Sequence, residues 1–98
     1  IFGPVVCVIP YDDIDEAIDQ ANSLPWAFQA EVFTQNMTTA RHASQQLDAS
    51  AVMINDHTAF RVDWMPFAGL RQSGLGVGGI PHTLHDMQIQ KMVVMDAR

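Results

Sequence analysis

The first half of the chain shows two patterns of apolar and polar residues, one typical of strands and one typical of helices. Three short apolar runs are separated by two stretches whose apolar residues recur at helical spacing. The runs are Val5 to Ile9, Ala30 to Phe33 and Ala51 to Ile54. The first is uninterrupted and rich in β-branched side chains, which is typical of a strand buried on both faces of a sheet. The order predicts an α/β fold containing a parallel β-α-β-α-β layer with right-handed crossovers.

The two intervening stretches predict amphipathic helices. The first helix is capped by Asp12 or Asp13 and ends at Asn22 to Pro25. Its acidic residues form a solvated face, which we favour over a metal site. The second helix begins at Met37, with Asn36 or Thr34 as its cap. The apolar face of the first helix comprises Ile14, Ala17, Ile18 and Ala21, and one side of the second comprises Met37, Ala40, Ser44 and Leu47.

Asn55 to Met65 forms a loop that leaves the third predicted strand at its carboxyl end. Ligands of parallel layers bind at the carboxyl ends of the strands, so this loop is the expected site. It carries two aromatic side chains, Phe60 and Trp64, and one positive charge, Arg61.

Met65 to Gly79 contains one proline and five glycines in fifteen positions. Such a segment is a poor helix or strand, and its glycines allow close backbone approach. We expect a shaped loop that places the Phe67 ring beside another surface. Gly74 to Gly79 also fits the spacing of a Gly-x-Gly-x-x-Gly dinucleotide fingerprint, but a loop precedes it where the fingerprint needs a buried strand, so we reject that interpretation.

The end of the chain predicts a helix followed by a strand. Ile80 and Pro81 open the helix, with Leu84 and Met87 facing inward. Gln88 to Met95 then reads as an apolar terminal strand. His82 and His85 on this helix are interpreted as a surface pair, because no third metal ligand is in view.

Composition narrows the classes of partner. A chain of 98 residues suits one small domain, and 48% hydrophobic with 16% charged residues suggests more apolar surface than a free-standing domain would expose. A net charge of −6 with scattered basic residues argues against nucleic acid and membrane surfaces as partners. The single cysteine, Cys7, excludes an internal disulfide and fits a reducing compartment such as the cytoplasm. Its apolar neighbours predict an inert, buried thiol.

Three motifs resemble NAD(P)-dependent aldehyde dehydrogenases. Pro66 to Gly69, followed by Ser73-Gly74 and Gly76, resembles the family's Pro-Phe-Gly-Gly…Ser-Gly…Gly signature. Ile1 to Val5 resembles its Ile-Phe-Gly-Pro-Val segment, and Asn55 resembles the asparagine before its substrate-entrance loop. The sequence Phe60-Arg61-Val62-Asp63 is similar to the branch of the family that contains lactaldehyde dehydrogenases and non-phosphorylating glyceraldehyde-3-phosphate dehydrogenases. Ala27, Ser50 and Ala68 stand where the family has glycine.

The resemblance implies that residues 1–98 are a C-terminal fragment of the catalytic and oligomerisation region of such an enzyme. The family oxidises aldehydes to acids by cysteine attack, hydride transfer to NAD or NADP and hydrolysis of a thioester. The nucleophilic cysteine lies upstream, so we expect no catalytic residue here and no activity from the isolated chain. The matching phenylalanine contacts the nicotinamide, which makes Phe2 a cofactor-binding candidate. Alternatively, Phe2 is a hydrophobic anchor at the chain end.

The resemblance also assigns substrate-binding residues and partners. Phe60 and Phe67 would form apolar walls of the aldehyde tunnel. Arg61 would meet an anionic substrate tail or pair with Asp56 or Asp63. The implied partners are the remainder of the dehydrogenase chain, a small aldehyde, and further copies that pair through the terminal strand. The alternative function is a non-catalytic remnant that self-associates.

Overall fold

Two parallel strands form the centre of the computed structural model, which describes residues 2–98. Strand β2 (Gln29–Val32) pairs with β3 (Ala51–Ile54) along its whole length, and helix α2 (Met37–Gln46) connects the two strands. Parallel neighbours require such a crossover. The predicted α/β class and the parallel pairing of these two strands are therefore confirmed.

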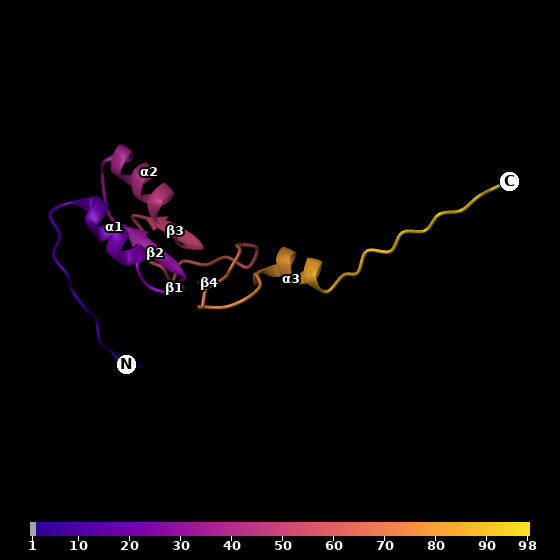
Figure 1. Cartoon of the computed structure of the whole chain (residues 1–98), viewed down its shortest axis with the longest axis horizontal. Coiled ribbons are helices and arrows are strands. Elements are labelled where there is room, and N and C mark those ends of the chain that lie inside the picture. Colours follow the sequence, from indigo (N-terminus) through magenta and orange to yellow (C-terminus); the bar gives the residue numbers. More distant parts are fainter. Residues whose placement is uncertain (1) are drawn as a thin grey trace.

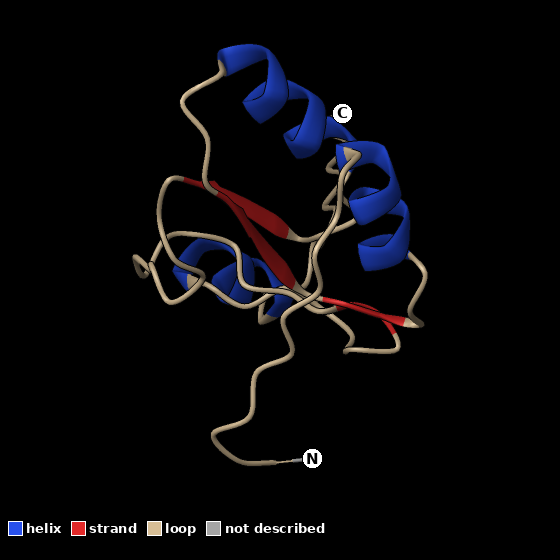
Figure 2. Ribbon diagram, turned by 90° about the vertical axis from the view of Figure 1, so that its left-hand side faces the viewer, coloured by secondary structure: helices blue, strands red, loops and turns tan. Residues whose placement is uncertain are grey.

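Helix α1 (Ile14–Asn22) lies beside α2 on one side of this sheet (Figures 1 and 2). Both predicted caps form: Asp13 accepts a hydrogen bond from the Asp15 N–H, and Asn36 accepts bonds from Thr38 and Thr39. These side chains satisfy amide groups that have no partner in the first helical turn. The buried apolar residues are Ile18, Ala40, Ala43 and Met53.

The face of α2 differs from the prediction at Ser44. Ala43, one position earlier, is buried at 1% exposure, whereas Ser44 is exposed and its hydroxyl donates to the Arg41 carbonyl oxygen. Met37 is exposed as well. The buried stripe of α2 therefore follows the two small side chains Ala40 and Ala43.

The structure contains a second sheet, a two-residue pairing of strands that the sequence did not predict. Strand β1 (Trp26–Ala27) pairs antiparallel with β4 (Leu70–Arg71), which brings the glycine-rich segment back to the end of α1. Phe67 and Gly78 form an isolated antiparallel bridge that closes the segment on itself. The two hydrogen bonds of this bridge measure 3.1 and 2.7 Å.

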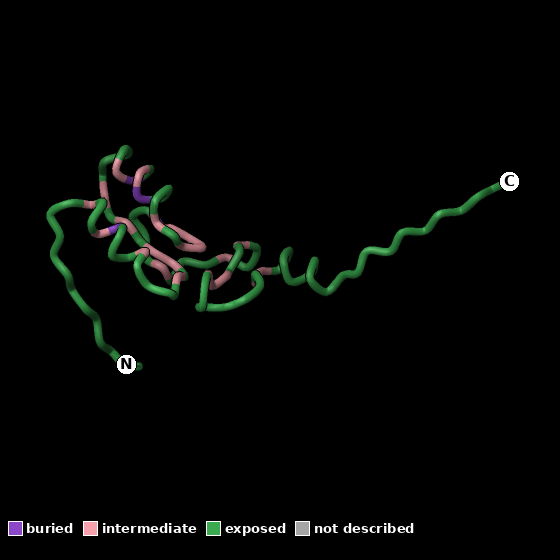
Figure 3. Tube along the Cα trace, viewed as in Figure 1, coloured by how far each residue is buried: buried purple, intermediate pink, exposed green. Residues whose placement is uncertain are grey.

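The N-terminal segment contradicts one prediction. Val5 to Ile9 has no strand partner within residues 2–98 and is exposed throughout (Figure 3). Cys7 is exposed as well, so the expectation of a buried thiol is wrong for this chain. The physical reason is that a strand buried on both faces needs neighbouring strands and covering helices.

The C-terminal residues also extend away from the rest of the molecule (Figure 1). Helix α3 (Ile80–Asp86) forms with Pro81 in its first turn, as predicted, but Leu84 and Met87 are 57% and 79% exposed and do not face inward. Gln88 to Met95 forms no strand in the described structure, because no other segment lies beside it. The radius of gyration, 19.1 Å, consequently exceeds the about 13 Å of a compact domain of this length.

Among residues 2–98, every helix is too short or too polar to cross a lipid bilayer.

Candidate functional site

The predicted site loop begins at a sharp turn after β3. Asn55 has a φ of 58°, a left-handed conformation that asparagine tolerates better than most residues. Its N–H donates to the Val32 carbonyl oxygen at 2.9 Å, and its side chain bonds the backbone of Thr34. The loop therefore leaves the carboxyl ends of β2 and β3 in a fixed direction.

Further hydrogen bonds hold the loop against the sheet and the last helix. The Thr58 N–H donates to a carboxylate oxygen of Glu31, on β2, at 3.1 Å. The Ile80 N–H donates to the Asp63 carbonyl oxygen at 2.9 Å, which ties the loop to the start of α3. The Phe60 N–H completes a turn by donating to His57. The backbone of the predicted site is thus anchored at both ends.

Phe67 is the centre of the only aromatic cluster among the described residues. The rings of Phe28 and Phe67 meet edge to face, with centroids 4.9 Å apart and planes at 88°. The guanidinium carbon of Arg61 lies 4.4 Å from the Phe67 ring centroid. Both arrangements are favourable, because the ring face is negative and its edge positive. We call Phe28, Phe67 and Arg61 the aromatic wall.

Arg61 makes no ion pair with Asp56 or Asp63 in the described part of the chain. Its guanidinium lies over the Phe67 ring instead. The structure therefore brings two predicted site residues together, and it leaves the Arg61 charge available to an external anion.

Phe60 and Phe67 are 45% and 42% exposed. Phe60 makes no aromatic pair with Phe67 within residues 2–98, although both come from the same continuous stretch. Both side chains are exposed, so they can contact a ligand without first leaving a packed core.

Phe2 stands apart from the aromatic wall. It is fully exposed in the N-terminal segment, which runs away from the loop in Figure 1. Gly74 to Gly79 provides no dinucleotide cradle either, because the strand before it, β4, pairs antiparallel at the surface. Residues 2–98 do not form a cofactor site by themselves in this structure, and the assignment of Phe2 stays a prediction. Groups of three or more metal-ligating side chains are also absent from residues 2–98.

Two anchoring residues were missed by the sequence analysis. Phe28 lacked a recognisable signal, because its partner Phe67 is remote in sequence. Glu31 is a charged residue on a short strand, and only its contact with Thr58 reveals its part in the site. Ser50 had a signal, since it replaces a family glycine: its N–H and hydroxyl both donate to the Phe28 carbonyl oxygen, at 2.7 and 2.6 Å.

Comparison with known proteins matches residues 1–93 to the model of the aldehyde dehydrogenase family. The chain is 36% identical over 98 residues to a lactaldehyde dehydrogenase of Methanococcus aeolicus, covering 100% of this chain and 21% of that protein. It is 33% identical over 96 residues to a 3-sulfolactaldehyde dehydrogenase of Priestia aryabhattai, covering 98% and 20%.

Solved structures agree. The NADP complex of an NADP-dependent glyceraldehyde-3-phosphate dehydrogenase from Bacillus halodurans superposes with a TM-score of 0.80 and 38% identity, over 85% of this chain and 17% of that one. The NAD+ complex of an aldehyde dehydrogenase from Bacillus cereus gives a TM-score of 0.79 at the same identity. The chain spans about a fifth of the length of the curated relatives it matches.

Proposed function

This chain belongs to the aldehyde dehydrogenase family, and from that premise we propose that it supplies part of the substrate entrance of an enzyme that oxidises an aldehyde to its carboxylic acid. The contact of Phe67 with both Phe28 and Arg61 is the observation that supports this role most directly. It presents an apolar surface with a cationic rim, beside the loop at the carboxyl ends of the parallel strands. Residues 1–98 then act as a C-terminal portion of the catalytic and oligomerisation region.

The aromatic wall divides two tasks. Phe67, together with Phe60 in the preceding loop, contacts the carbon skeleton of the aldehyde and excludes water from it. Arg61 binds an anionic tail, because a guanidinium offers paired N–H donors that match carboxylate, phosphate or sulfonate oxygens. Two relatives support an anionic substrate: one is named for 3-sulfolactaldehyde and another for glyceraldehyde 3-phosphate.

The reacting groups come from outside these residues. Cys7 lies in the exposed N-terminal segment, apart from the aromatic wall, so we assign it no role as nucleophile. NAD or NADP supplies the hydride acceptor in the family's reaction, and similar structures hold one or the other. Phe2 would offer that cofactor one apolar contact once further polypeptide surrounds it.

The terminal segment supports assembly. Ile89, Val93 and Met95 are 95%, 63% and 85% exposed on an extended backbone. Unpaired backbone groups beside apolar side chains favour pairing with another strand. We assign this segment to a contact between copies of the parent enzyme.

The natural gene product tests the proposal. Its intact mass is compared with the 10.9 kDa of this chain, and NAD(P)H formation is followed with lactaldehyde and with anionic aldehydes. A larger, active product is expected, together with no turnover by the 98 residues alone. A natural product of 10.9 kDa that self-associates without affinity for NAD or NADP would overturn the proposal in favour of a non-catalytic module.

A further inference from the structure

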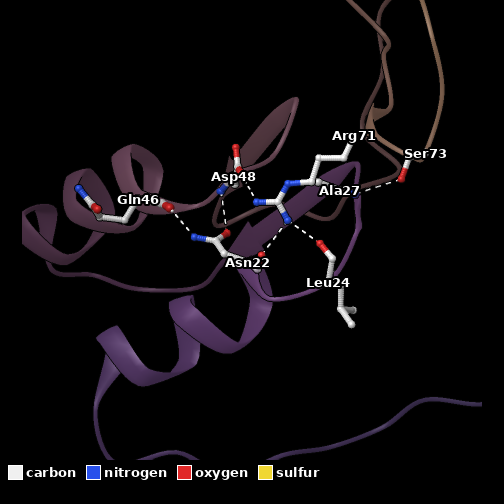
Figure 4. A network of polar contacts seen from close by, with 7 residues as sticks. All are labelled: Asn22, Leu24, Ala27, Gln46, Asp48, Arg71 and Ser73. Atoms are coloured by element: carbon white, nitrogen blue, oxygen red, sulfur yellow. Dashed lines mark hydrogen bonds and ion pairs between the residues drawn. The ribbon is translucent and has the colours of Figure 1, made fainter.

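The guanidinium of Arg71 joins the ends of two helices to the glycine-rich segment (Figure 4). One of its nitrogens, Nη1, donates to the Asn22 carbonyl oxygen at 2.7 Å and to the Leu24 carbonyl oxygen. The other, Nη2, pairs with the carboxylate of Asp48. A cation is favourable at this place, because the last carbonyl groups of a helix lack partners and carry partial negative charge.

Asn22 links the same two helix ends through its side chain. Its Nδ2 donates to the Gln46 carbonyl oxygen at 2.8 Å, and its Oδ1 accepts from the Asp48 N–H at 2.9 Å. Figure 4 shows the Asn22 side-chain amide reaching Gln46 and Asp48, while the Asn22 backbone carbonyl oxygen faces the Arg71 guanidinium. Two of the three residues that bind Arg71, Asn22 and Asp48, are therefore themselves held in place.

This network is connected to the aromatic wall through β1 and β4. Arg71 pairs with Trp26, and Leu70 pairs with Ala27. The Ala27 N–H also donates to the Ser73 hydroxyl oxygen at 3.0 Å. Phe28 follows β1 directly, whereas two residues, Ala68 and Gly69, separate Phe67 from β4. The two rings of the wall thus belong to the two segments that Arg71 fastens together.

The backbone of Arg71 gives a second indication. Its φ of 54° lies in the left-handed region, which a residue with a Cβ adopts at an energetic cost. A single surface ion pair contributes little stability, but here one planar group satisfies two carbonyl oxygens as well as a carboxylate. These bonds account for an arginine at a position where the backbone would favour glycine.

We propose that Arg71 is a positioning residue of the substrate entrance: it holds β4 so that the Phe67 ring stays against Phe28 and beneath Arg61. This inference rests on the proposed function, because the aromatic wall contacts substrate only if the parent enzyme oxidises aldehydes. The wall acts in binding, and the chemical step belongs to groups outside this chain. Loss of Arg71 therefore affects the aldehyde KM before it affects kcat.

The test compares Arg71→Ala with Arg41→Ala in the natural gene product. Arg41 is an exposed arginine on α2 whose side chain makes no hydrogen bond or ion pair within residues 2–98, so it controls for loss of charge. Arg71→Ala is expected to weaken the nuclear Overhauser contact between the Phe28 and Phe67 rings. It should also raise the aldehyde KM about tenfold with a smaller change in kcat, because charge-assisted hydrogen bonds of this kind are lost.

The two readouts separate the two proposals. If the unaltered protein oxidises no aldehyde, the proposed function fails, while the ring contact still tests the positioning. An undisturbed ring contact in Arg71→Ala, or a fall in kcat at unchanged KM, would overturn the role of Arg71. Should Arg71→Ala fail to fold, Arg71→Lys and Asp48→Asn replace it. Both should raise the KM by a smaller factor, and an unchanged KM in both overturns the proposal.

Discussion

Asn55 and Thr34 exchange two hydrogen bonds through one side chain. The Thr34 N–H donates to Asn55 Oδ1 at 2.8 Å, and Asn55 Nδ2 donates to the Thr34 carbonyl oxygen at 2.9 Å. An amide side chain has the same donor and acceptor as a peptide group. Asn55 therefore continues the β2–β3 pairing by one step while its own backbone turns away at a φ of 58°.

Replacement of Asn55 by alanine should lower the free energy of unfolding of the chain by about 1–2 kcal/mol, because two partly exposed hydrogen bonds disappear. Asn55→Gly should lose nearly as much, since glycine relieves only the backbone strain. Urea denaturation measures both. Gln45→Ala removes an exposed amide from α2 and should stay within about 0.5 kcal/mol of the original. If Asn55→Gly were as stable as the original protein, the backbone turn and not the side-chain hydrogen bonds would account for the stabilising effect of Asn55.

Gly79→Ala should open the bridge between Phe67 and Gly78. A Cβ at Gly79 would lie 2.6 Å from the Met65 carbonyl oxygen, and the φ of 111° disfavours any residue with a side chain. We expect amide hydrogen exchange at Phe67 to accelerate at least about tenfold. Gly3→Ala is the matched control, because a Cβ there meets nothing within 4 Å. Equal exchange rates at Phe67 in both variants would contradict the close approach of Gly79 to the Met65 carbonyl oxygen.

Phe28 and Phe67 should be energetically coupled. Alanine substitutions made singly and together are expected to give a coupling free energy of about 0.5–1.5 kcal/mol, the usual range for edge-to-face rings. Chemical denaturation supplies the four free energies. A cycle of Phe67→Ala with Met37→Ala, at an exposed position of α2, should be additive within about 0.5 kcal/mol. Additivity in the Phe28 cycle would mean that the ring contact contributes nothing to stability.

Arg61→Gln should discriminate between substrates of the parent enzyme. With an aldehyde that carries an anionic tail, kcat/KM is expected to fall about tenfold or more, because the charged partner is lost. A neutral aldehyde of similar length should be affected far less. Salt should reduce the difference by screening the exposed charge. Equal losses with both aldehydes would remove Arg61 from recognition of the tail and leave it as a support for Phe67.

The terminal segment should control assembly. Val93→Lys places a charge on the exposed apolar stretch, and lysines on edge strands oppose strand pairing. Analytical ultracentrifugation of the natural gene product is expected to show a smaller oligomer for the Val93→Lys variant than for the unaltered protein. Gln45→Lys adds the same charge on α2 and should leave the oligomer intact. Unchanged assembly in Val93→Lys would exclude this stretch as the contact.

Local patterns predicted the local structure. Caps at Asp13 and Asn36 and the extent of β3 follow from side chains within a few residues of one another. Asn55 and Phe67 were recognised through motifs. None of these predictions required knowledge of which distant segments meet, and for that reason they could be made from the sequence.

The remaining features depend on distant or external partners. The contacts of Phe28 with Phe67 and of Arg71 with Asp48 join residues whose separation leaves no periodic signal. Val5 to Ile9 and Gln88 to Met95 have strand composition, but composition does not reveal whether a neighbouring strand is present. Ala27, Ser50 and Ala68, which stand where the family has glycine, have no positive φ among the described residues, so none of them needs the left-handed backbone that glycine favours.

The sequence distances within the Arg71 network imply an order of folding. Its hydrogen bonds to Asn22 and Leu24 close loops of 49 and 47 residues, whereas Gln29 and Ala51 in the parallel ladder lie only 22 positions apart (51 minus 29). Longer loops lose more chain entropy on closure, and contacts remote in sequence form more slowly. The parallel strands and α2 should therefore assemble first, with the aromatic wall docking onto them in the last step. A cell that synthesises this protein would briefly contain molecules with a finished parallel sheet and an aromatic wall that has not yet docked.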